Sequence, residues 1–180
     1  MIKWIFVLSR WSICLSLVGL ASCTVQSNQL GLFTSAAKPQ QDALQMYRWR
    51  LEFGRYQTDL LAVTVPGETL FTNSEDDLVV FDGWMVTEVR GLGQPSVISV
   101  QGQVGERLTR KDSRRVGSQE CEEWRLMQEG SHVIHEQYCV GIERFENRII
   151  VDSSGSIIKI EQYLGLKELG KKTAIILTKL

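Results

Sequence analysis

The stretch LVVFDGWMVTEV, residues 78–89, decides the fold class of this chain. Two runs that are rich in β-branched and aromatic residues flank the dipeptide Asp82-Gly83. Such a dipeptide favours a two-residue type I′ hairpin turn, because both turn positions need positive φ angles. The stretch therefore predicts two antiparallel strands joined by a tight turn at Asp82-Gly83.

Period-two alternation continues on both sides of this hairpin. In YRWRLEF, the large apolar residues alternate with charged ones and are expected on one face of a strand; they are Tyr47, Trp49, Leu51 and Phe53. Further strands are predicted at 59–65, 95–104 and 171–180, and a second hairpin around 153–155. The helical candidates, 40–46 and 106–114, are poor in large apolar residues. The sequence thus predicts an all-β domain, an antiparallel sheet curled into a sandwich or open β-barrel with little helix.

The first 22 residues have the pattern of an export signal. Lys3 and Arg10 precede or flank an apolar run at 11–20, which is shorter than the roughly 20 residues of a membrane-spanning helix. The run ends in LASC, residues 20–23, which resembles the bacterial lipobox. The resemblance implies cleavage before Cys23 and attachment of a diacylglycerol to its thiol. The alternatives are an ordinary signal peptide, or an N-terminal membrane helix with a chance cysteine.

This interpretation divides the chain into three parts: 1–22 as a lipoprotein signal peptide, 23–41 as a lipidated tether and 42–180 as a single β-rich domain. Acyl chains at about 0.8 kcal/mol per buried methylene, palmitate among them, would hold the protein on a membrane. Thr24, where a retained lipoprotein has Asp, is typical of sorting to the outer membrane, with the domain facing the periplasm. The balance of 20 basic and 21 acidic residues does not suggest nucleic-acid binding.

Two of the four cysteines remain in the expected domain. A turn centred on Gly130 pairs Cys121 with Cys139 and Arg125 with His135. Directly opposed residues of an antiparallel pair lie about 4.5 Å apart at Cα, which permits a disulfide in an oxidising compartment. The alternatives are two reduced buried thiols, or a register shifted by one or two residues.

The sequence contains no readable catalytic or metal-binding motif. On a strand, His132 and His135 point to opposite faces and do not form a metal site. The acidic run at 75–77 lacks the spacing of a calcium loop and is expected to be a solvated turn. We therefore expect neither an enzyme nor a cofactor.

The segment RLTRKDSRR, residues 107–115, concentrates positive charge. Its basic residues, candidates for contact with an anionic ligand, are Arg107, Arg110, Lys111, Arg114 and Arg115. One interpretation is contact with lipid phosphates or an acidic polysaccharide. The other is an ordinary solvated loop.

Two segments resemble the YjbF-type lipoproteins of group 4 capsule and exopolysaccharide export loci. The first covers 46–65 and 70–93, and its matching residues are Leu78, Val79, Asp82, Gly83, Thr87, Gly91 and Leu92. The second is FENRIIVDSSGSIIKIEQYLG, matched through Asn147, Val151, Asp152, Gly155, Ile158 and Gln162. The lipobox also agrees with this family.

The resemblance implies a β-rich outer-membrane lipoprotein that assists polysaccharide export, without assigned catalytic residues. Its expected partners are the membrane, reached through Cys23, and polysaccharide-export proteins or the polysaccharide itself. The alternative is a carrier or acceptor of lipids or lipoproteins, whose half-barrel would need an apolar cavity; its expected lining is Leu51, Phe53, Val80 and Met85. A hydrolase of the cell envelope is a third and weaker hypothesis for the function. The sequence leaves the oligomeric state open.

Overall fold

The regular structure of the described residues is entirely β. The computed structural model describes residues 47–168 and 171–180, which form thirteen strands and no helix. The strands are β1 (Tyr47–Phe53), β2 (Tyr56–Val65), β3 (Glu68–Thr72), β4 (Leu78–Phe81), β5 (Val86–Arg90), β6 (Val97–Gln101), β7 (Gly105–Lys111), β8 (Arg114–Cys121), β9 (Arg125–Glu129), β10 (His132–Val140), β11 (Arg144–Val151), β12 (Ile157–Glu168) and β13 (Lys171–Lys179). The all-β prediction is confirmed.

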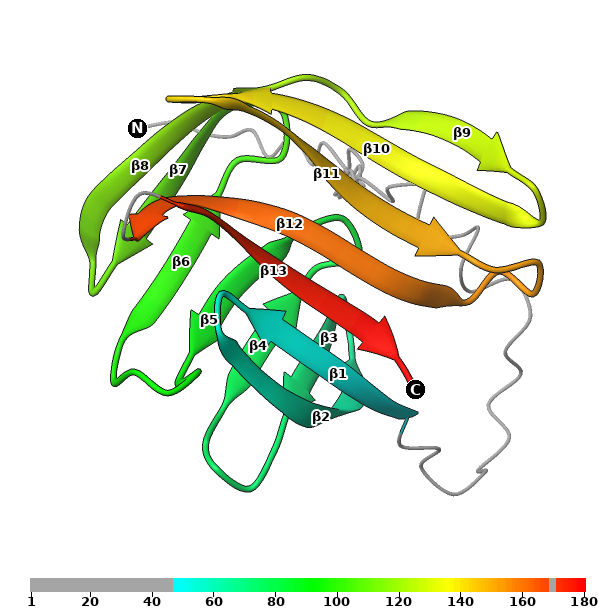
Figure 1. The fold of residues 1–180 in the computed structure, drawn as a ribbon, viewed down its shortest axis with the longest axis horizontal. Helices are drawn as coiled ribbons and strands as arrows, with labels where there is room; N and C mark the ends of the chain where they lie inside the picture. The colour runs from blue at the N-terminus through cyan, green and yellow to red at the C-terminus, as the bar shows by residue number, and fades with distance from the viewer. Residues whose placement is uncertain (1–46, 169–170) are drawn as a thin grey trace, which may run out of the picture.

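The antiparallel strands close into a barrel (Figure 1). Neighbouring strands pair in chain order from β1 to β8, β8 then pairs with β10, and β10 to β13 follow in order. β13 pairs with β1 and completes the ring, with Leu51 opposite Leu177. β9 stands outside the ring and pairs with β10. A sheet that closes on itself has few unpaired edges; among the described strands, β9 has a neighbour on one side only.

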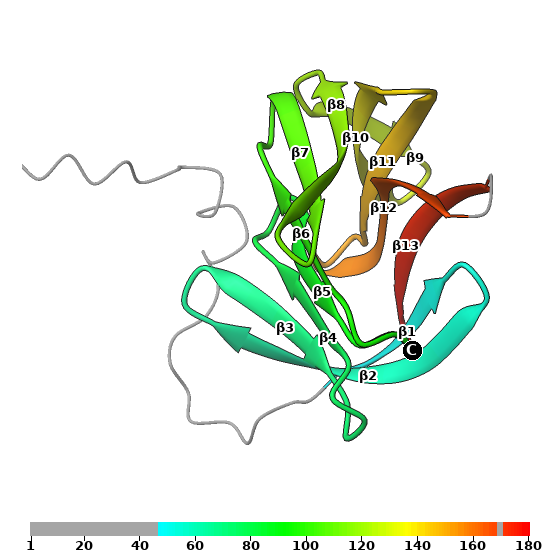
Figure 2. The same cartoon turned by 90° about the vertical axis from the view of Figure 1, so that its left-hand side faces the viewer.

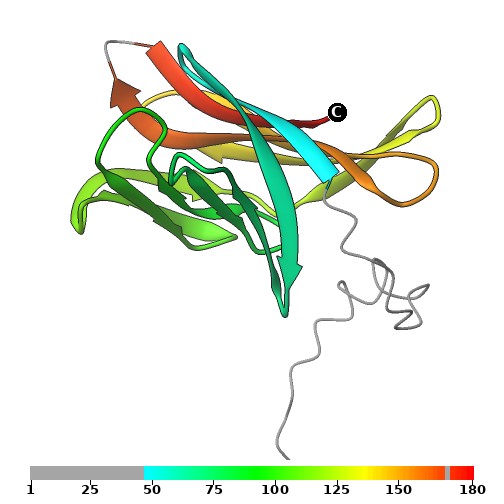
Figure 3. The same cartoon turned by 90° about the horizontal axis from the view of Figure 1, so that it is seen from below.

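The barrel is flattened, and its interior is packed with side chains. Figures 2 and 3 show β12 and β13 running across the strands β4 to β7. Trp49 and Phe71 meet edge to face in the core, with ring centroids 5.1 Å apart. The core cluster consists of Trp49, Leu51, Phe53, Leu60, Phe71, Val79, Phe81, Met85, Val86, Val89, Leu92, Ile98, Val100, Ile149, Val151, Ile160, Leu164, Leu166, Ile175 and Leu177.

Hydrogen bonds across the interior hold the two walls together. The side-chain amide of Gln162 on β12 accepts from the backbone N–H of Val86 at 2.7 Å and donates to its carbonyl at 3.1 Å. The Thr109 hydroxyl on β7 donates to the carbonyl of Leu164 at 2.6 Å. These bonds satisfy polar groups that would otherwise be costly to bury, and they fix β12 against the opposite wall.

The hairpin at 78–89 forms, but its turn differs from the prediction. Four residues, 82–85, connect β4 and β5, and of these Gly83 has a positive φ, of 95°. The Asp82 carboxylate accepts from the backbone N–H groups of Trp84 and Met85, which stabilises this wider turn. The predicted two-residue type I′ turn at Asp82-Gly83 is therefore wrong.

The hairpin between β9 and β10 also departs from the predicted register. Gly130 and Ser131 form a two-residue turn rather than the three-residue turn expected. Arg125 therefore lies opposite Glu136 and not opposite His135. The three residues at 122–124, which lie outside the strands, restore the register, so that Cys121 lies opposite Cys139.

A short seam between β8 and β10 completes the barrel wall. Its ladder contains two residue pairs, Cys139 with Cys121 and Val140 with Glu120. Cys121 and Cys139 form a disulfide with their Cα atoms 4.1 Å apart, and both side chains are buried. The covalent bond thus reinforces the shortest pairing between neighbouring strands of the described barrel.

We expect that the double variant Cys121→Ser/Cys139→Ser loses about 3 kcal/mol of unfolding free energy, as the chain-entropy model gives for a cross-link between residues 18 apart. Urea unfolding of the oxidised wild type and the double variant measures this difference. Equal transition midpoints would show that the disulfide does not stabilise the seam.

Candidate functional site

The basic segment 107–115 forms the hairpin of β7 and β8. Neither the predicted loop nor the weak helical candidate at 106–114 is correct. Asp112 and Ser113, with φ angles of 49° and 68°, make the two-residue turn. Positive φ at both positions is the condition for a type I′ turn. This turn type, expected at Asp82-Gly83, is thus found at Asp112-Ser113.

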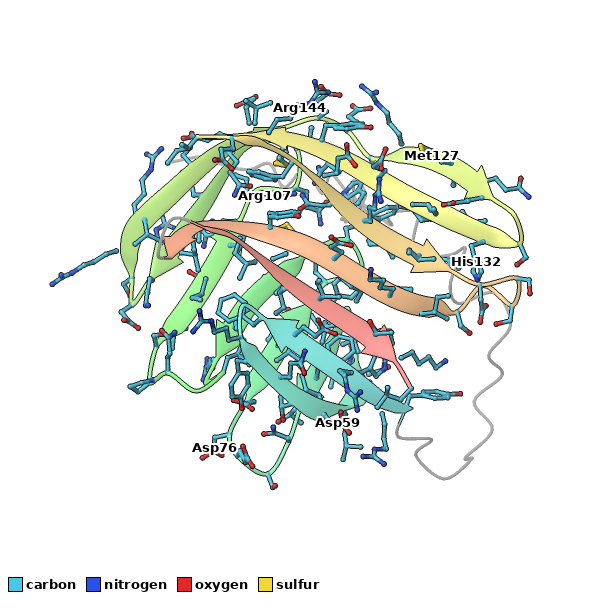
Figure 4. The ribbon with its side chains drawn as sticks, in the orientation of Figure 1. Asp59, Asp76, Arg107, Met127, His132 and Arg144 are labelled. Atoms are coloured by element: carbon cyan, nitrogen blue, oxygen red, sulfur yellow. A yellow bond between two sulfur atoms is a disulfide. The ribbon has the colours of Figure 1, made fainter. Side chains whose placement is uncertain are left out.

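Arg107 belongs to the barrel interior and not to the basic surface. Its side chain is fully buried, and Figure 4 shows it within the barrel. The guanidinium donates to the carbonyls of Gly102 and Gln103 at 2.9 and 3.0 Å and to the Gln137 side chain at 2.7 Å. Its role as an exposed anion contact is therefore wrong, because strand alternation turns Arg107 inward with Thr109.

The environment of Arg107 is polar but contains no hydrogen-bonded carboxylate among the described residues. Burial lowers the pKa of Arg107 to about 10, and the charge of Asp82 opposes this shift. The guanidinium also donates to Cys139 Sγ at 3.6 Å. Asn147 lies beside the same sulfur at 3.3 Å. Arg107 therefore fastens the loop after β6 to β10, next to the disulfide.

The other four basic residues surround the hairpin turn. Arg110 lies opposite Arg115, and Lys111 opposite Arg114. Directly opposed like charges repel each other. Arg115 pairs with Glu106 at 2.9 Å. In the described part of the chain, Arg114 forms no hydrogen bond or ion pair, and its side chain is exposed. We call Arg110, Lys111, Arg114 and Arg115 the basic tip.

The acidic run at 75–77 contains a buried residue that the sequence interpretation missed. Asp77 is 2% exposed, whereas a solvated turn was expected. Its carboxylate accepts from Tyr56 Oη at 2.6 Å, from Asn73 Nδ2 at 2.8 Å and from the N–H of Leu92 at 2.6 Å. Three segments of the barrel meet at this one carboxylate.

Gly91 makes this contact feasible. A Cβ at this position would lie 2.5 Å from Asp77 Oδ1, and its φ of 74° also favours glycine. Asp77 and Gly91 are 14 residues apart, and no local sequence pattern links them, so the buried carboxylate could not be recognised from spacing.

The Asp77 network should be visible in a pH titration. The hydrogen bond to Asp77 raises the pKa of Tyr56 to about 12. Since the folded pKa lies above the ordinary value of about 10, the stabilisation by the Tyr56 hydroxyl is complete below pH 10 and is lost as the pH rises through 12.

We therefore expect wild type to exceed Tyr56→Phe in stability by a constant margin below pH 10 and by a shrinking margin from pH 10 to 12. Chemical denaturation at several pH values measures both margins, and ultraviolet titration follows the phenol. A margin that does not change up to pH 12 would contradict the assignment.

Trp84, Trp124 and His135 form an aromatic cluster rather than a ligand set. Trp84 lies 5.7 Å from Trp124 and 5.3 Å from His135, measured between ring centroids. Burial lowers the pKa of His135. His132 is exposed at the start of β10. Within 47–168 and 171–180, no group of three or more His, Cys, Asp or Glu side chains is placed to hold a metal ion.

The cavity that a lipid carrier would need is not lined as expected. Leu51, Phe53 and Met85 are part of the packed core. Val80 lies on the other side of β4 from the core residues Val79 and Phe81. Val80 and Met85 border a groove of about 500 Å³, whose lining also includes the charged residues Glu68, Asp82 and Glu88. The four residues therefore do not share one concave apolar surface.

The remaining predicted features lie outside the described residues: the signal peptide at 1–22, the tether at 23–41, the helical candidate at 40–46 and the lipidation site Cys23. Among the described residues, no helix has the length and hydropathy needed to cross a membrane.

Taken together, the fold is a flattened, closed antiparallel β-barrel with a packed interior and a basic hairpin tip. The solved structure of the hypothetical lipoprotein YmcC from Escherichia coli K12 is similar to it, with a TM-score of 0.51 and 13% sequence identity. The match covers 87% of this chain and 95% of YmcC. No protein-family model and no curated protein matches the sequence. At this identity the comparison shows a shared fold.

Proposed function

We propose that this protein is a non-enzymatic lipoprotein, anchored through Cys23 in the outer membrane and facing the periplasm, that assists secretion of capsule or exopolysaccharide. The observation that carries the proposal is a shared fold: YmcC, which is named a hypothetical lipoprotein, matches this chain over 95% of its own length. The lipobox at 20–23 of this chain supports the same anchor. The family resemblance of the two hairpin segments supports the link to polysaccharide export.

The arrangement of the barrel suits such a task. β1 follows the tether and begins at the lower right of Figure 1, whereas the turn between β7 and β8 lies at the left. The basic tip therefore points away from the start of the domain. An acidic polymer would find there a cluster of cations whose mutual repulsion it relieves.

The anchor and the export role are tested separately. Radioactive palmitate should label the wild type and not Cys23→Ala, and deletion of the gene should lower the amount of surface polysaccharide. Expression of the wild-type protein in the deletion strain should restore the surface polysaccharide, whereas expression of the Cys23→Ala variant should not. Unlabelled protein would overturn the anchor, and unchanged polysaccharide in the deletion strain would overturn the export role.

The basic tip is tested by charge removal. We expect Lys111→Gln/Arg114→Gln to weaken salt-dependent binding to an acidic polysaccharide such as polygalacturonate about threefold to tenfold, the range for two exposed ionic contacts. Thermal melting of the double variant verifies that it is folded. Titration calorimetry at two salt concentrations measures the affinity.

A matched control removes the same charge elsewhere. Arg48 and Arg50 on β1 both pair with Asp59, outside the basic tip. Arg48→Gln/Arg50→Gln should therefore bind the polymer like wild type. Equal losses in the two double variants would show that net charge, and not the tip, governs binding.

A further inference from the structure

β9 presents a free strand edge on the outside of the barrel. It pairs with β10 on one side and, among the described strands, has no neighbour on the other. All five of its residues are exposed, including Leu126 at 68% and Met127 at 43%. Figure 4 shows Met127 at the outer margin of the molecule, well away from Arg107. A free edge of this kind is a template for pairing with another strand.

The register of the hairpin fixes which backbone groups face outward. Glu129 and His132 close a two-residue turn and therefore form a hydrogen-bonded pair. Because hydrogen-bonded and non-hydrogen-bonded pairs alternate, Met127 and Arg125 also direct their N–H and C=O groups toward β10. The N–H and C=O groups of Leu126 and Gln128 consequently point to the free edge.

The sequence of this edge, RLMQE, is complementary to itself. In an antiparallel pair centred on Met127, the Arg125 of each copy lies opposite the Glu129 of the other. Leu126 then lies opposite Gln128, and these are the residues whose backbone groups face outward. The alternation of the backbone hydrogen bonds and the pairing of opposite side-chain charges thus favour the same register.

We propose that β9 is a homodimerisation edge, at which two copies of this chain pair antiparallel about a two-fold axis through Met127. Each side of the axis gains backbone hydrogen bonds between Leu126 and Gln128 and an ion pair between Arg125 and Glu129. The two Met127 side chains meet in the central non-hydrogen-bonded pair, where side chains come closest. The barrels of both copies then share a continuous sheet.

The position of Arg125 agrees with this arrangement. Its guanidinium lies 5.4 Å from the centroid of the Tyr138 ring and pairs with Glu122, so it stays on the outer face of the hairpin. Alternation places Met127 and Glu129 on that same face. With five N–H donors, one guanidinium can serve both Glu122 and the incoming Glu129.

The short edge implies a reversible dimer. Five residues on each copy cover far less than the roughly 1,200 Å² typical of stable interfaces. Cross-linking in intact cells that express the full chain is therefore a better assay than chromatography of dilute protein. This readout is independent of lipidation and of polysaccharide export, so its failure is distinct from failure of the proposed function.

The test uses single cysteines at the edge. Under mild oxidation, Met127→Cys should give a dimer on non-reducing gels, because this residue meets its own copy at about 4.5 Å between Cα atoms. Leu126→Cys, which is more exposed than Met127 but lies diagonal to its own copy, is the control and should stay largely monomeric. Equal dimer yields from the two variants would overturn the proposal.

Charge exchange tests the register. In the Met127→Cys background, Glu129→Arg should lower the dimer yield at least threefold, because Arg125 of the other copy then faces a like charge. Adding Arg125→Glu should restore the yield, since the exchanged charges again oppose each other. A yield that is insensitive to Glu129→Arg, or not restored by the exchange, would overturn the register. Thermal melting of each purified variant verifies that it is folded.

Discussion

The barrel depends on the seam between β8 and β10. In the described structure, this ladder has two residue pairs, whereas the other pairings between neighbouring strands of the ring have three or more. Without it, the ends of β8 and β10 would be unpaired edges on either side of an open sheet. The Cys121–Cys139 disulfide makes the seam covalent. The Arg107 side chain on β7 donates hydrogen bonds both to the loop after β6 and to Gln137 on β10. The closure of the barrel therefore depends on a disulfide and on hydrogen bonds at one place, whereas hydrophobic packing stabilises the rest of the barrel.

The side chains buried near the seam differ from those in the rest of the interior. β1 to β6, β12, β13 and the end of β11 contribute the apolar core cluster. β7, β8, β10 and the middle of β11 bury a group of polar side chains, namely Arg107, Thr109, Gln119, Gln137 and Asn147. Neutral amides and carbonyls surround the guanidinium, so its charge is solvated by fixed dipoles rather than by a carboxylate. A buried charge held in this way requires specific geometry from every neighbour, which favours one arrangement of the seam.

Local periodicity was sufficient to predict most of the strands, but not β7, whose segment resembled a helix or a loop. The pairing of Cys121 with Cys139 was predicted from a turn register that is one residue off, and residues 122–124 compensate for that difference. Period two identified Trp49, Leu51 and Phe53 as core residues, because alternation along one strand is a local property. The turns were predicted less well: Asp82 widens its turn with its own carboxylate, whereas Asp112 and Ser113 adopt positive φ without a glycine. The inward position of Arg107 and the burial of Asp77 depend on partners far away in sequence, Gln137 and Leu92, and no spacing rule contains that information.

Pairing of β1 with β13 has a consequence for the order of folding. Trp49 lies opposite Lys179, so the first and last strands described must find each other before the ring is complete. Such a contact has a very large sequence separation and raises the contact order of the fold, which slows folding. A partly synthesised chain can form local hairpins, but it lacks β13, the strand that joins the two ends of the sheet. The native state is thus reached after residues 171–179 have emerged, and the chain must stay soluble until then.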